Sequence, residues 1–284
     1  MPDSIGAAGA FDRLGERAHA WSVTIDETRE TETSLIAVGR RGDVPVALKI
    51  VKAGNDEWQS GAIVRAFDGH GVVRVFESVA GALLLERIVP GDSLEGFTID
   101  GRDDDAIEIV ADVITRMGST SPPPGCATVE QWGEAFSRYV ASGDRRIARE
   151  LVEEAHQTFA ALSASQRDVR LLHGDLHHYN VLADATRGWL AIDPKGVVGE
   201  VEYELGAFFR NPIARPDLVV EPAIVDRRLD RFTRALGVDR DRTIAWVFAQ
   251  AILSAIWTLE DGFEAADARL AIDLAAVTRK MNGR

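Results

Sequence analysis

The chain contains 284 residues, of which 46% are hydrophobic and 27% charged, and its formal net charge is −13. The length suits one large domain or two lobes around a sizeable core, and the acidic balance argues against the basic surface that nucleic-acid binding requires. No apolar run approaches the roughly 20 residues of a membrane span, and residues 1–10 lack the basic start and long apolar stretch of a signal peptide.

The first 88 residues have the pattern of a small β-sheet. Short helices are predicted over residues 11–20 and 56–67. Apolar and β-branched runs bounded by turn residues predict five strands, over residues 21–25, 34–38, 44–51, 72–76 and 82–86. The last strand leads into Pro90-Gly91, a break that marks a boundary between two lobes.

Lys49 lies in the middle of an apolar strand, Val46-Ala47-Leu48-Lys49-Ile50. A lysine there is costly unless it meets an anion, and Val-Ala-x-Lys is where a kinase carries the lysine that pairs with the ATP phosphates. The alternative is an edge lysine whose ammonium group reaches solvent. Glu57 is placed to pair with Lys49, although an acid in a first helical turn is also favoured by the helix dipole alone.

Two further segments are candidates for nucleotide contacts. The connection over residues 27–33 contains no glycine, unlike the glycine-rich loop of protein kinases, so backbone N–H groups and the hydroxyls of Thr33 or Ser34 would cover the phosphates. At the lobe boundary, the backbone groups of Glu86 and Ile88 would meet adenine. That second assignment rests on position alone.

From residue 89 onward the pattern is mainly helical. Helices are predicted over residues 103–117, 129–142, 144–162, 221–236 and 241–259. The last of these keeps apolar residues at i, i+3 and i+4 throughout, and Trp246, Leu253 and Trp257 widen its apolar face. It is therefore expected to be largely buried, with Gly262 as its cap.

The segment His173-Gly174-Asp175-Leu176-His177-His178-Tyr179-Asn180 precedes a predicted hairpin that ends on Asp193. The spacing His-x-Asp, then Asn five positions after that Asp, then a strand-borne Asp, matches the catalytic loop and metal-binding Asp of protein kinases. Asp175 would accept the proton of the acceptor hydroxyl. Asn180 and Asp193 would hold the Mg²⁺ that neutralises the phosphates.

A turn or a zinc site would fit this segment less well than a kinase loop. Asp175 could be a turn residue and Asn180 a strand-edge cap, because both residue types favour turns. The three histidines invite comparison with metallohydrolases, but no histidine follows His178 to supply ligands from downstream strands. Three separate elements at the right offsets favour the kinase interpretation.

Two segments, Leu171–His178 with Asn180 and Ile192–Glu200, resemble the aminoglycoside phosphotransferases. The Asp-Pro-Lys-Gly form at residues 193–196 is similar to the branch of streptomycin 6-kinases and hydroxyurea-resistance kinases. The supporting stretches are residues 83–86, 210–212 and 257–262, and together the resemblance spans residues 20 to 262.

The resemblance implies an α+β, protein-kinase-like fold of two lobes. Residues 1–88 would form the nucleotide-binding lobe with a small antiparallel sheet, and residues 89–284 a mainly helical lobe that holds the catalytic residues and the acceptor. It also implies transfer of the γ-phosphate of ATP, with Mg²⁺, to a hydroxyl of a small molecule. Lys49 and Glu57 would orient the phosphates, Asp175 would be the base, and Asn180 and Asp193 the metal ligands.

Two departures from protein kinases bear on the substrate. Lys195 stands where they have the glycine of Asp-Phe-Gly, and no Ala-Pro-Glu segment follows, which argues against a protein substrate. Tyr179 replaces a small residue and would either narrow the acceptor pocket or pack into the helical lobe.

Acidic residues indicate a cationic acceptor. Glu260-Asp261 ends an almost wholly apolar helix, where the dipole disfavours negative charge, so these acids should meet either a protein arginine or a cationic group of the substrate. Glu200, Glu202 and Glu204 alternate as on an exposed strand or loop edge. The candidate acceptor-binding residues are Glu200, Asn211, Glu260 and Asp261.

The best single prediction is therefore an ATP- and Mg²⁺-dependent kinase of a hydroxylated, cationic small molecule, such as streptomycin. A sugar or amino alcohol on the same fold is the alternative acceptor. A non-catalytic nucleotide-binding regulator is disfavoured because Lys49, Asp175, Asn180 and Asp193 are all present. The single Cys126 excludes an internal disulfide, so a cytoplasmic location is expected; monomer and homodimer are both open, as are ATP and GTP.

Overall fold

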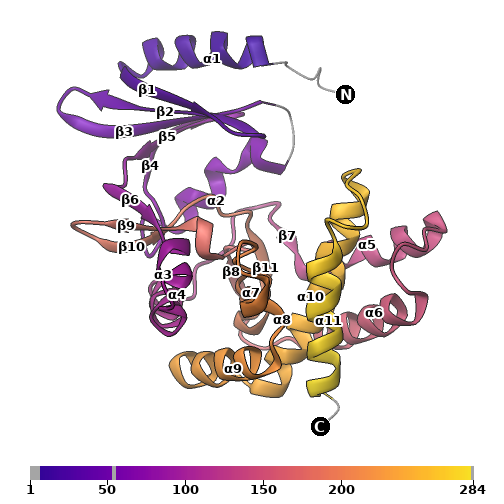
Figure 1. Ribbon diagram of the computed structural model, residues 1–284. Helices are drawn as coiled ribbons and strands as arrows, with labels where there is room; N and C mark the ends of the chain where they lie inside the picture. The colour runs from indigo at the N-terminus through magenta and orange to yellow at the C-terminus, as the bar shows by residue number, and fades with distance from the viewer. Residues whose placement is uncertain (1–6, 53–55, 283–284) are drawn as a thin grey trace.

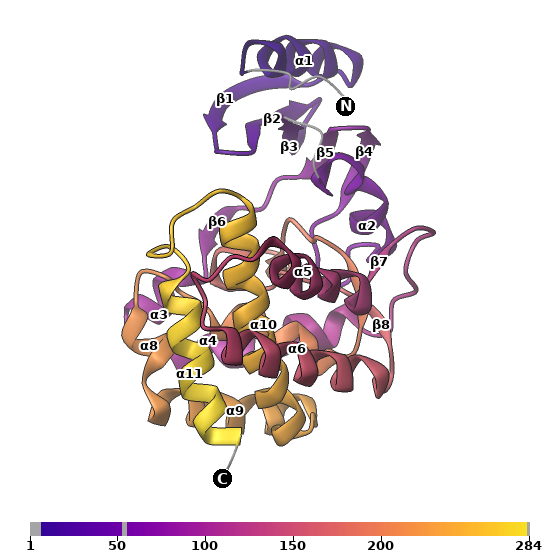
Figure 2. The same cartoon turned by 90° about the vertical axis from the view of Figure 1, so that its right-hand side faces the viewer.

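The computed structural model describes residues 7–52 and 56–282. Figure 1 shows a small sheet at the N-terminal end above a larger, mainly helical part, and Figure 2 shows the same division from the side. The sheet ends at Glu86 and the next strand begins at Pro90. The predicted lobe boundary after residue 88 falls between these two strands and remains a prediction.

The N-terminal sheet is antiparallel, with strand order β1-β2-β3-β5-β4. Its strands are β1 (Thr24–Glu30), β2 (Ser34–Arg41), β3 (Val44–Val51), β4 (Val75–Val79) and β5 (Ala82–Glu86). Helix α1 (Ala7–Ala20) covers one face, where Leu14 packs against Leu35, Leu48 and Leu84. The opposite face of β3 carries Lys49, so this lysine lies on the other side of the sheet from the small core.

The structure corrects three element predictions in this part. The fourth strand was expected over residues 72–76 but is β4, Val75–Val79. The first strand was expected over residues 21–25 but runs over Thr24–Glu30, because β1 is an exposed edge strand with polar residues on both faces. The connection to β2 therefore shortens to residues 31–33. The helix expected over residues 56–67 is instead a short 3₁₀ helix, Asp56–Gln59, followed by α2 (Gly61–Ala66).

Short strands join the sheet to the helices. β6 (Pro90–Ser93), β9 (Val181–Asp184) and β10 (Gly188–Ala191) form one three-stranded sheet, and β9 with β10 is the predicted hairpin. β7 (Ala127–Thr128), β8 (Arg170–Leu172) and β11 (Val197–Gly199) form another. These two small sheets hold the segments on either side of residues 173–180, the predicted catalytic loop.

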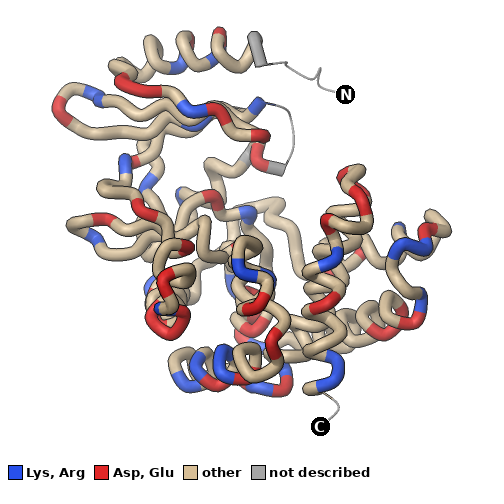
Figure 3. The backbone as a smooth tube through the Cα atoms, in the orientation of Figure 1, with Lys and Arg blue, Asp and Glu red and all other residues tan. Residues whose placement is uncertain are grey.

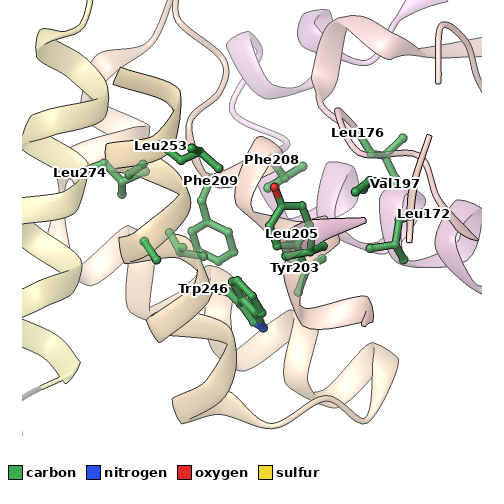
Figure 4. Close-up of a cluster of buried hydrophobic side chains, with 14 of the residues drawn as sticks. Leu172, Leu176, Val197, Tyr203, Leu205, Phe208, Phe209, Trp246, Leu253 and Leu274 are labelled. Carbon is green, nitrogen blue, oxygen red and sulfur yellow. The ribbon is translucent and has the colours of Figure 1, made fainter. Parts of the chain in front are cut away.

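Helix α10 (Arg240–Glu260) is the centre of the helical part, and α5, α6, α7 and α11 pack around it. Figure 4 shows Trp246 and Leu253 of α10 meeting Tyr203 and Phe209 of α7 and Leu274 of α11. The helices are α3 (Glu95–Ile99), α4 (Asp103–Met117), α5 (Val129–Ser142), α6 (Arg149–Ala164), α7 (Val201–Phe209), α8 (Pro216–Val220), α9 (Pro222–Leu236), α10 and α11 (Arg269–Asn282).

By length and composition alone, α10 could also cross a membrane, and it is the one such helix within residues 7–52 and 56–282. However, 78% of the 18-residue apolar stretch of this helix is buried inside the protein. The apolar period that predicted a buried helix over residues 241–259 therefore reflects packing in the protein core.

Charged residues of the helical part are mostly paired with one another. Figure 3 shows Lys and Arg alternating with Asp and Glu, for example along α9. Arg228 on α9 is fully buried and binds Asp103 at the start of α4 through two hydrogen bonds, of 2.7 and 3.0 Å. These bonds hold the pKa of Asp103 below its usual value despite burial, which opposes that shift.

Candidate active site

The catalytic loop lies between β8 and β9 and is tied to the hairpin by hydrogen bonds. Asn180 Nδ2 donates to the carbonyl oxygen of Asp175 at 3.0 Å, and the Ile192 N–H donates to the carbonyl oxygen of Asn180 at 2.9 Å. His173 Nε2 lies 2.8 Å from the carbonyl oxygen of Ile192. The structure thus brings Asp175, Asn180 and the segment that carries Asp193 together, as the spacing predicts.

Asp193 has a backbone conformation that side chains rarely adopt, with φ at 56°. A non-glycine residue held in the left-handed region is costly and is found preferentially at functional sites. Here it turns the chain sharply at the end of the hairpin and sends the Asp193 side chain toward the N-terminal sheet.

The carboxylate of Asp175 is surrounded by groups that favour its ionised form. Burial would raise its pKa, but the hydrogen bond from His177 (Nε2 to Oδ2, 3.5 Å) and the positive charge of Arg210 (Nη2 to Oδ1, 4.0 Å) hold the pKa well below its usual value. Burial lowers the pKa of His173 to about 4, so this imidazole is neutral at pH 7. Asp175 is therefore an ionised acceptor at neutral pH, as a proton-accepting base must be.

Glu204, on α7, holds the backbone of the catalytic loop from beneath. Its carboxylate accepts the N–H of His173 at 2.6 Å and the N–H of Gly174 at 3.0 Å. Gly174 has φ at +84°, where a side chain is strained, so the loop can present both N–H groups to one carboxylate. Burial raises the pKa of Glu204 to about 7, although these hydrogen bonds oppose the shift.

The raised pKa of Glu204 predicts how stability depends on pH. The folded state holds this proton more tightly than the unfolded chain, in which the pKa of the group is near 4.5. The contribution of Glu204 to the free energy of unfolding is therefore full below pH 4.5 and is lost as pH rises through about 7. The loss should reach at most about 3 kcal/mol. Urea unfolding at pH 5 to 8 should show this decline in the wild type and not in Glu204→Gln. Glu202→Gln, on the same helix but without bonds to the loop, is the matched control and should keep it.

Lys49 lies between the carboxylates of Glu57 and Asp193, and its pairing with Glu57 agrees with the prediction. Its ammonium group is 2.8 Å from Asp193 Oδ1 and 3.0 Å from Glu57 Oε2. Lys195 binds the other oxygen of Glu57 at 2.8 Å, so the loop after Asp193 is joined to the segment before α2. Burial lowers the pKa of Lys49, but the two carboxylates outweigh that effect and raise it, so the lysine is charged.

The residues expected to hold Mg²⁺ have suitable chemistry. Asp193 offers a carboxylate, and the bond from Asn180 Nδ2 to Asp175 leaves the amide oxygen of Asn180 available. Mg²⁺ prefers oxygen ligands and commonly takes one or two from protein and the rest from phosphates and water. Within the described residues, no group of three or more His, Cys, Asp and Glu side chains is placed to hold a metal ion.

For the other residues predicted to contact the nucleotide, the structure shows which of their polar groups already have a protein partner. Ser34 lies on the same face of β2 as Ile36, whose partner across the sheet is Lys49, and its hydroxyl is buried without a hydrogen bond. The Ile88 N–H has no partner within the described part of the chain. Glu86 uses its N–H on Arg74 and its carboxylate on Arg74 and Arg187, so an adenine contact by Glu86 is restricted to its carbonyl oxygen.

A cavity of about 960 Å³ opens beside Asp175. Its walls come from α2, the segment 123–127, α5, the catalytic loop and the end of α10. The aromatic rings of Trp132 and Trp257 meet edge to face at 5.5 Å between centroids and form part of the wall. The charged lining residues are Arg138, Asp175, Lys195, Arg210 and Asp261. Because the proposed base lines this cavity, we call it the acceptor pocket.

A family model described as an aminoglycoside/hydroxyurea antibiotic resistance kinase matches residues 20–262. The chain belongs to this family. It is 35% identical to a streptomycin 3''-kinase of Klebsiella pneumoniae over 92% of this chain and 98% of the relative. It is also 31% identical to a hydroxyurea phosphotransferase of Kitasatospora aureofaciens, over 89% of this chain and 74% of the relative.

Solved structures agree on the fold of this antibiotic resistance kinase. A thermostable mutant of aminoglycoside phosphotransferase APH(4)-Ia superposes with a TM-score of 0.68 at 17% identity, over 94% of this chain and 97% of that one. The choline kinase LicA from Streptococcus pneumoniae superposes with a TM-score of 0.66 at 14% identity, over 96% and 98%. The predicted protein-kinase-like α+β fold is confirmed. The protein is an ATP- and Mg²⁺-dependent phosphotransferase with an alcohol group as acceptor.

Two of the residues expected to bind the acceptor of this kinase are placed elsewhere by the structure. Glu200 is 1% exposed and receives hydrogen bonds from Arg242 and Trp246, both at 2.5 Å. The supposed alternation of residues 200, 202 and 204 belongs to the start of α7 and not to a strand edge. The prediction for Glu200 is therefore wrong, since the α10 side chains occupy its carboxylate.

Asn211 is the second correction in the acceptor site of this kinase. It is 7% exposed, and its Nδ2 donates to the carbonyl oxygen of Ala207 at 2.9 Å. Its own carbonyl oxygen accepts from the buried Arg228 at 3.0 Å. Asn211 thus closes the C-terminal end of α7 and does not line the acceptor pocket.

The two acids at the end of α10 have different surroundings. Glu260 receives two hydrogen bonds from Arg138, both at 3.2 Å, so it has the internal arginine partner that was one of the two expectations. Asp261 lines the acceptor pocket, and its carboxylate has no hydrogen bond or ion pair within residues 7–52 and 56–282. The acceptor-binding prediction therefore narrows to Asp261.

Several residues of this kinase site were not predicted as site residues. In the sequence, Lys195 stands out only where protein kinases have a glycine, and Trp257 only as part of an apolar face; the sequence indicates no role for Arg210 or Trp132. No local pattern indicates them, because they reach the pocket from four different elements. Tyr179 contacts Glu95 and backbone groups at residues 213 and 214 and does not line the pocket, so it packs into the helical lobe.

Proposed function

We propose that this phosphotransferase transfers the γ-phosphate of ATP to a hydroxyl group of streptomycin. The observation that carries the proposal is that Asp175, an ionised base, shares one large pocket with the unpaired carboxylate of Asp261. The streptomycin kinases among the relatives support it, at 35% and 31% identity. A pocket of about 960 Å³ has the size of sites that enclose drug-sized ligands.

The charges of the acceptor pocket support a cationic acceptor. Each lining cation already has a protein carboxylate nearby: Arg138 has Glu260, Lys195 has Glu57 and Arg210 has Asp175. Among the described residues, Asp261 is the acid of the pocket wall that has no cationic partner in these pairs. A guanidinium or ammonium group of the acceptor would supply its partner through a charge-assisted hydrogen bond.

The aromatic wall supports the same kind of acceptor. Trp132 and Trp257 present apolar ring surface beside polar lining residues. Such rings pack against the apolar faces of sugar rings, and their faces also attract cations. A cationic oligosaccharide combines both features.

The residues would perform the transfer as follows. Asn180 and Asp193 would hold Mg²⁺, which would supply charge neutralisation at the phosphates. Asp175 takes the proton of the acceptor hydroxyl, and Lys49, held by Glu57, pairs with the ATP phosphates and orients them. The complete set of Lys49, Asp175, Asn180 and Asp193 argues against a catalytically silent regulator.

A second candidate acceptor is hydroxyurea, because one relative is a hydroxyurea phosphotransferase at 31% identity. Hydroxyurea is small and neutral, so it would fill little of the pocket and leave Asp261 unpaired. Neutral sugars and amino alcohols are further candidates on the same fold.

A coupled ADP-release assay with streptomycin, hydroxyurea, neutral sugars and amino alcohols tests the proposal directly. Streptomycin should give the highest kcat/KM, and mass spectrometry of the product should show one added phosphoryl group. Expression in a streptomycin-sensitive host should raise the inhibitory concentration. Turnover with a neutral acceptor and none with streptomycin would refute the acceptor assignment and leave the kinase assignment standing.

Asp261→Asn should raise KM for streptomycin roughly tenfold, equivalent to about 1.4 kcal/mol, and leave KM for ATP unchanged. The effect should shrink as salt rises, because partly exposed ion pairs are screened. Steady-state kinetics at two salt concentrations measure both. Glu264→Gln removes an equal charge from an exposed position outside the pocket and is the control. Equal changes of KM in the two variants would show that the net charge of the protein, and not a contact with Asp261, sets the affinity for the acceptor.

A further inference from the structure

Arg210 follows directly after α7 and reaches the acceptor pocket beside the catalytic base. Its side chain is 14% exposed, and its Nη2 lies 4.0 Å from Asp175 Oδ1. That separation gives electrostatic attraction but is too long for a hydrogen bond. Space for another group's oxygen atoms therefore remains next to both side chains.

The guanidinium group of Arg210 is anchored at one end only. Nη1 donates to Gln250 Oε1 at 3.0 Å. A guanidinium has five N–H donors, and within residues 7–52 and 56–282 the other donors of Arg210 have no hydrogen-bond partner. Because the side chain lines the pocket, those donors are available to a group bound there.

The anchor of Arg210 is built by close contact between α7 and α10. Gln250, on α10, also donates through Nε2 to the carbonyl oxygen of Tyr203 on α7, which fixes the direction of its amide. Gly206 makes this approach possible, since a Cβ at that position would lie 2.2 Å from Gln250 Oε1. Arg210, the C-cap of α7, is four residues after Gly206 and therefore lies on the same side of the helix. The core thus holds Arg210 in a defined position before any substrate binds.

We propose that Arg210 is a further catalytic residue, which donates hydrogen bonds to the non-bridging oxygens of the phosphoryl group as it passes to the acceptor. The attacking hydroxyl oxygen must lie within about 3 Å of Asp175 to lose its proton. The phosphorus that it attacks is bonded to it in the product. Oxygens on that phosphorus therefore fall within reach of a donor located 4.0 Å from the same carboxylate.

The step balances without any further reactant. The acceptor oxygen forms a bond to the γ-phosphorus, the bond from that phosphorus to the bridging oxygen breaks, and ADP leaves. The hydroxyl proton passes to Asp175, and Arg210 keeps all its protons. Negative charge spreads over the three non-bridging oxygens in the transition state, where a positioned arginine is most effective.

The proposed role of Arg210 concerns the transferred phosphoryl group, so it does not depend on streptomycin being the acceptor. The test compares wild type, Arg210→Gln and Arg210→Lys by kcat, with whichever acceptor supports turnover or with water in slow ATP hydrolysis. Calorimetry measures the affinity for Mg²⁺–ADP with and without aluminium fluoride, which mimics the transferring phosphoryl group.

Arg210→Gln should lower kcat roughly 10²- to 10³-fold, with the affinity for Mg²⁺–ADP changed less than about threefold. The tightening of ADP binding by aluminium fluoride should fall at least about tenfold, and added guanidinium salt at millimolar concentration should restore part of kcat. Arg210→Lys keeps the charge but loses the planar fork and should lie between the two. If Arg210→Gln does not fold, Arg210→Lys decides by the same measurements.

Arg242→Gln is the control for the loss of an arginine from the helical part, because Arg242 binds Glu200 away from the pocket. It should lower the melting temperature without changing the effect of aluminium fluoride. The proposal is overturned if folded Arg210 variants keep kcat within about threefold of wild type. It is equally overturned if the tightening by aluminium fluoride is unchanged, since Arg210 would then only brace α7 against α10.

Discussion

Asp175→Asn should lower kcat by roughly 10²- to 10⁴-fold while ATP still binds, because the amide cannot accept the hydroxyl proton. The change keeps the size of the side chain and the position of the loop, since the backbone of the loop is held by Glu204. Stopped-flow or steady-state kinetics give kcat, and calorimetry gives the affinity for Mg²⁺–ATP.

The pH profile provides an independent check on Asp175. Its pKa is held well below the usual value, so the carboxylate remains ionised throughout pH 5 to 9 and should produce no acidic limb of kcat in that range. A variant with near wild-type turnover would remove Asp175 from the mechanism. An acidic limb that persists unchanged in Asp175→Asn would have to come from another group.

Asp193→Ala should abolish Mg²⁺-dependent ATP binding, because the metal loses its only charged protein ligand among the proposed ones. Asn180→Ala should weaken it less, since an amide oxygen carries no charge. Calorimetric titration of ATP with and without Mg²⁺ separates the two effects. The metal-free titration is the control, and there the two variants should differ less.

Asp193→Ala also removes the 2.8 Å partner of Lys49, so a structural effect must be separated from metal loss. Asp193→Asn keeps the shape and a weak oxygen ligand, and it should bind Mg²⁺–ATP with an affinity between those of wild type and Asp193→Ala. Unchanged ATP affinity in Asp193→Ala would show that the end of the hairpin does not hold the metal.

The sequence predicted elements well where burial imposes a clear period. β3, β5, α4 and α5 have the predicted limits, because each buries one regular apolar face or run. β1 was misplaced because an exposed edge strand has no such pattern. α11 was missed for the related reason that its buried residues, such as Leu274, meet α10 along a narrow stripe.

The candidate site was predictable where its residues follow one another at fixed spacing. Asp175, Asn180 and Asp193 lie on one loop and one hairpin, so local chain geometry brings them together. Glu204, Arg210 and Gln250 depend on how α7 packs beneath the loop and against α10, which no local pattern encodes. Glu204 stood in a row of alternating acids and was assigned to a strand edge, although that row begins a helix.

The ion pair between Lys49 and Asp193 has a consequence for how the nucleotide and its metal bind. The ammonium group of Lys49 lies 2.8 Å from the carboxylate that is proposed to hold Mg²⁺, so free Mg²⁺ bound there would displace a cation from Asp193. In the proposed site, ATP without metal would draw Lys49 away from Asp193 and leave that carboxylate without a counter-charge. ATP would remove Lys49 from Asp193, and Mg²⁺ would replace the lost positive charge there. The two ligands should therefore bind cooperatively. Since such coupling is reciprocal, ATP should strengthen Mg²⁺ binding by the same factor by which Mg²⁺ strengthens ATP binding.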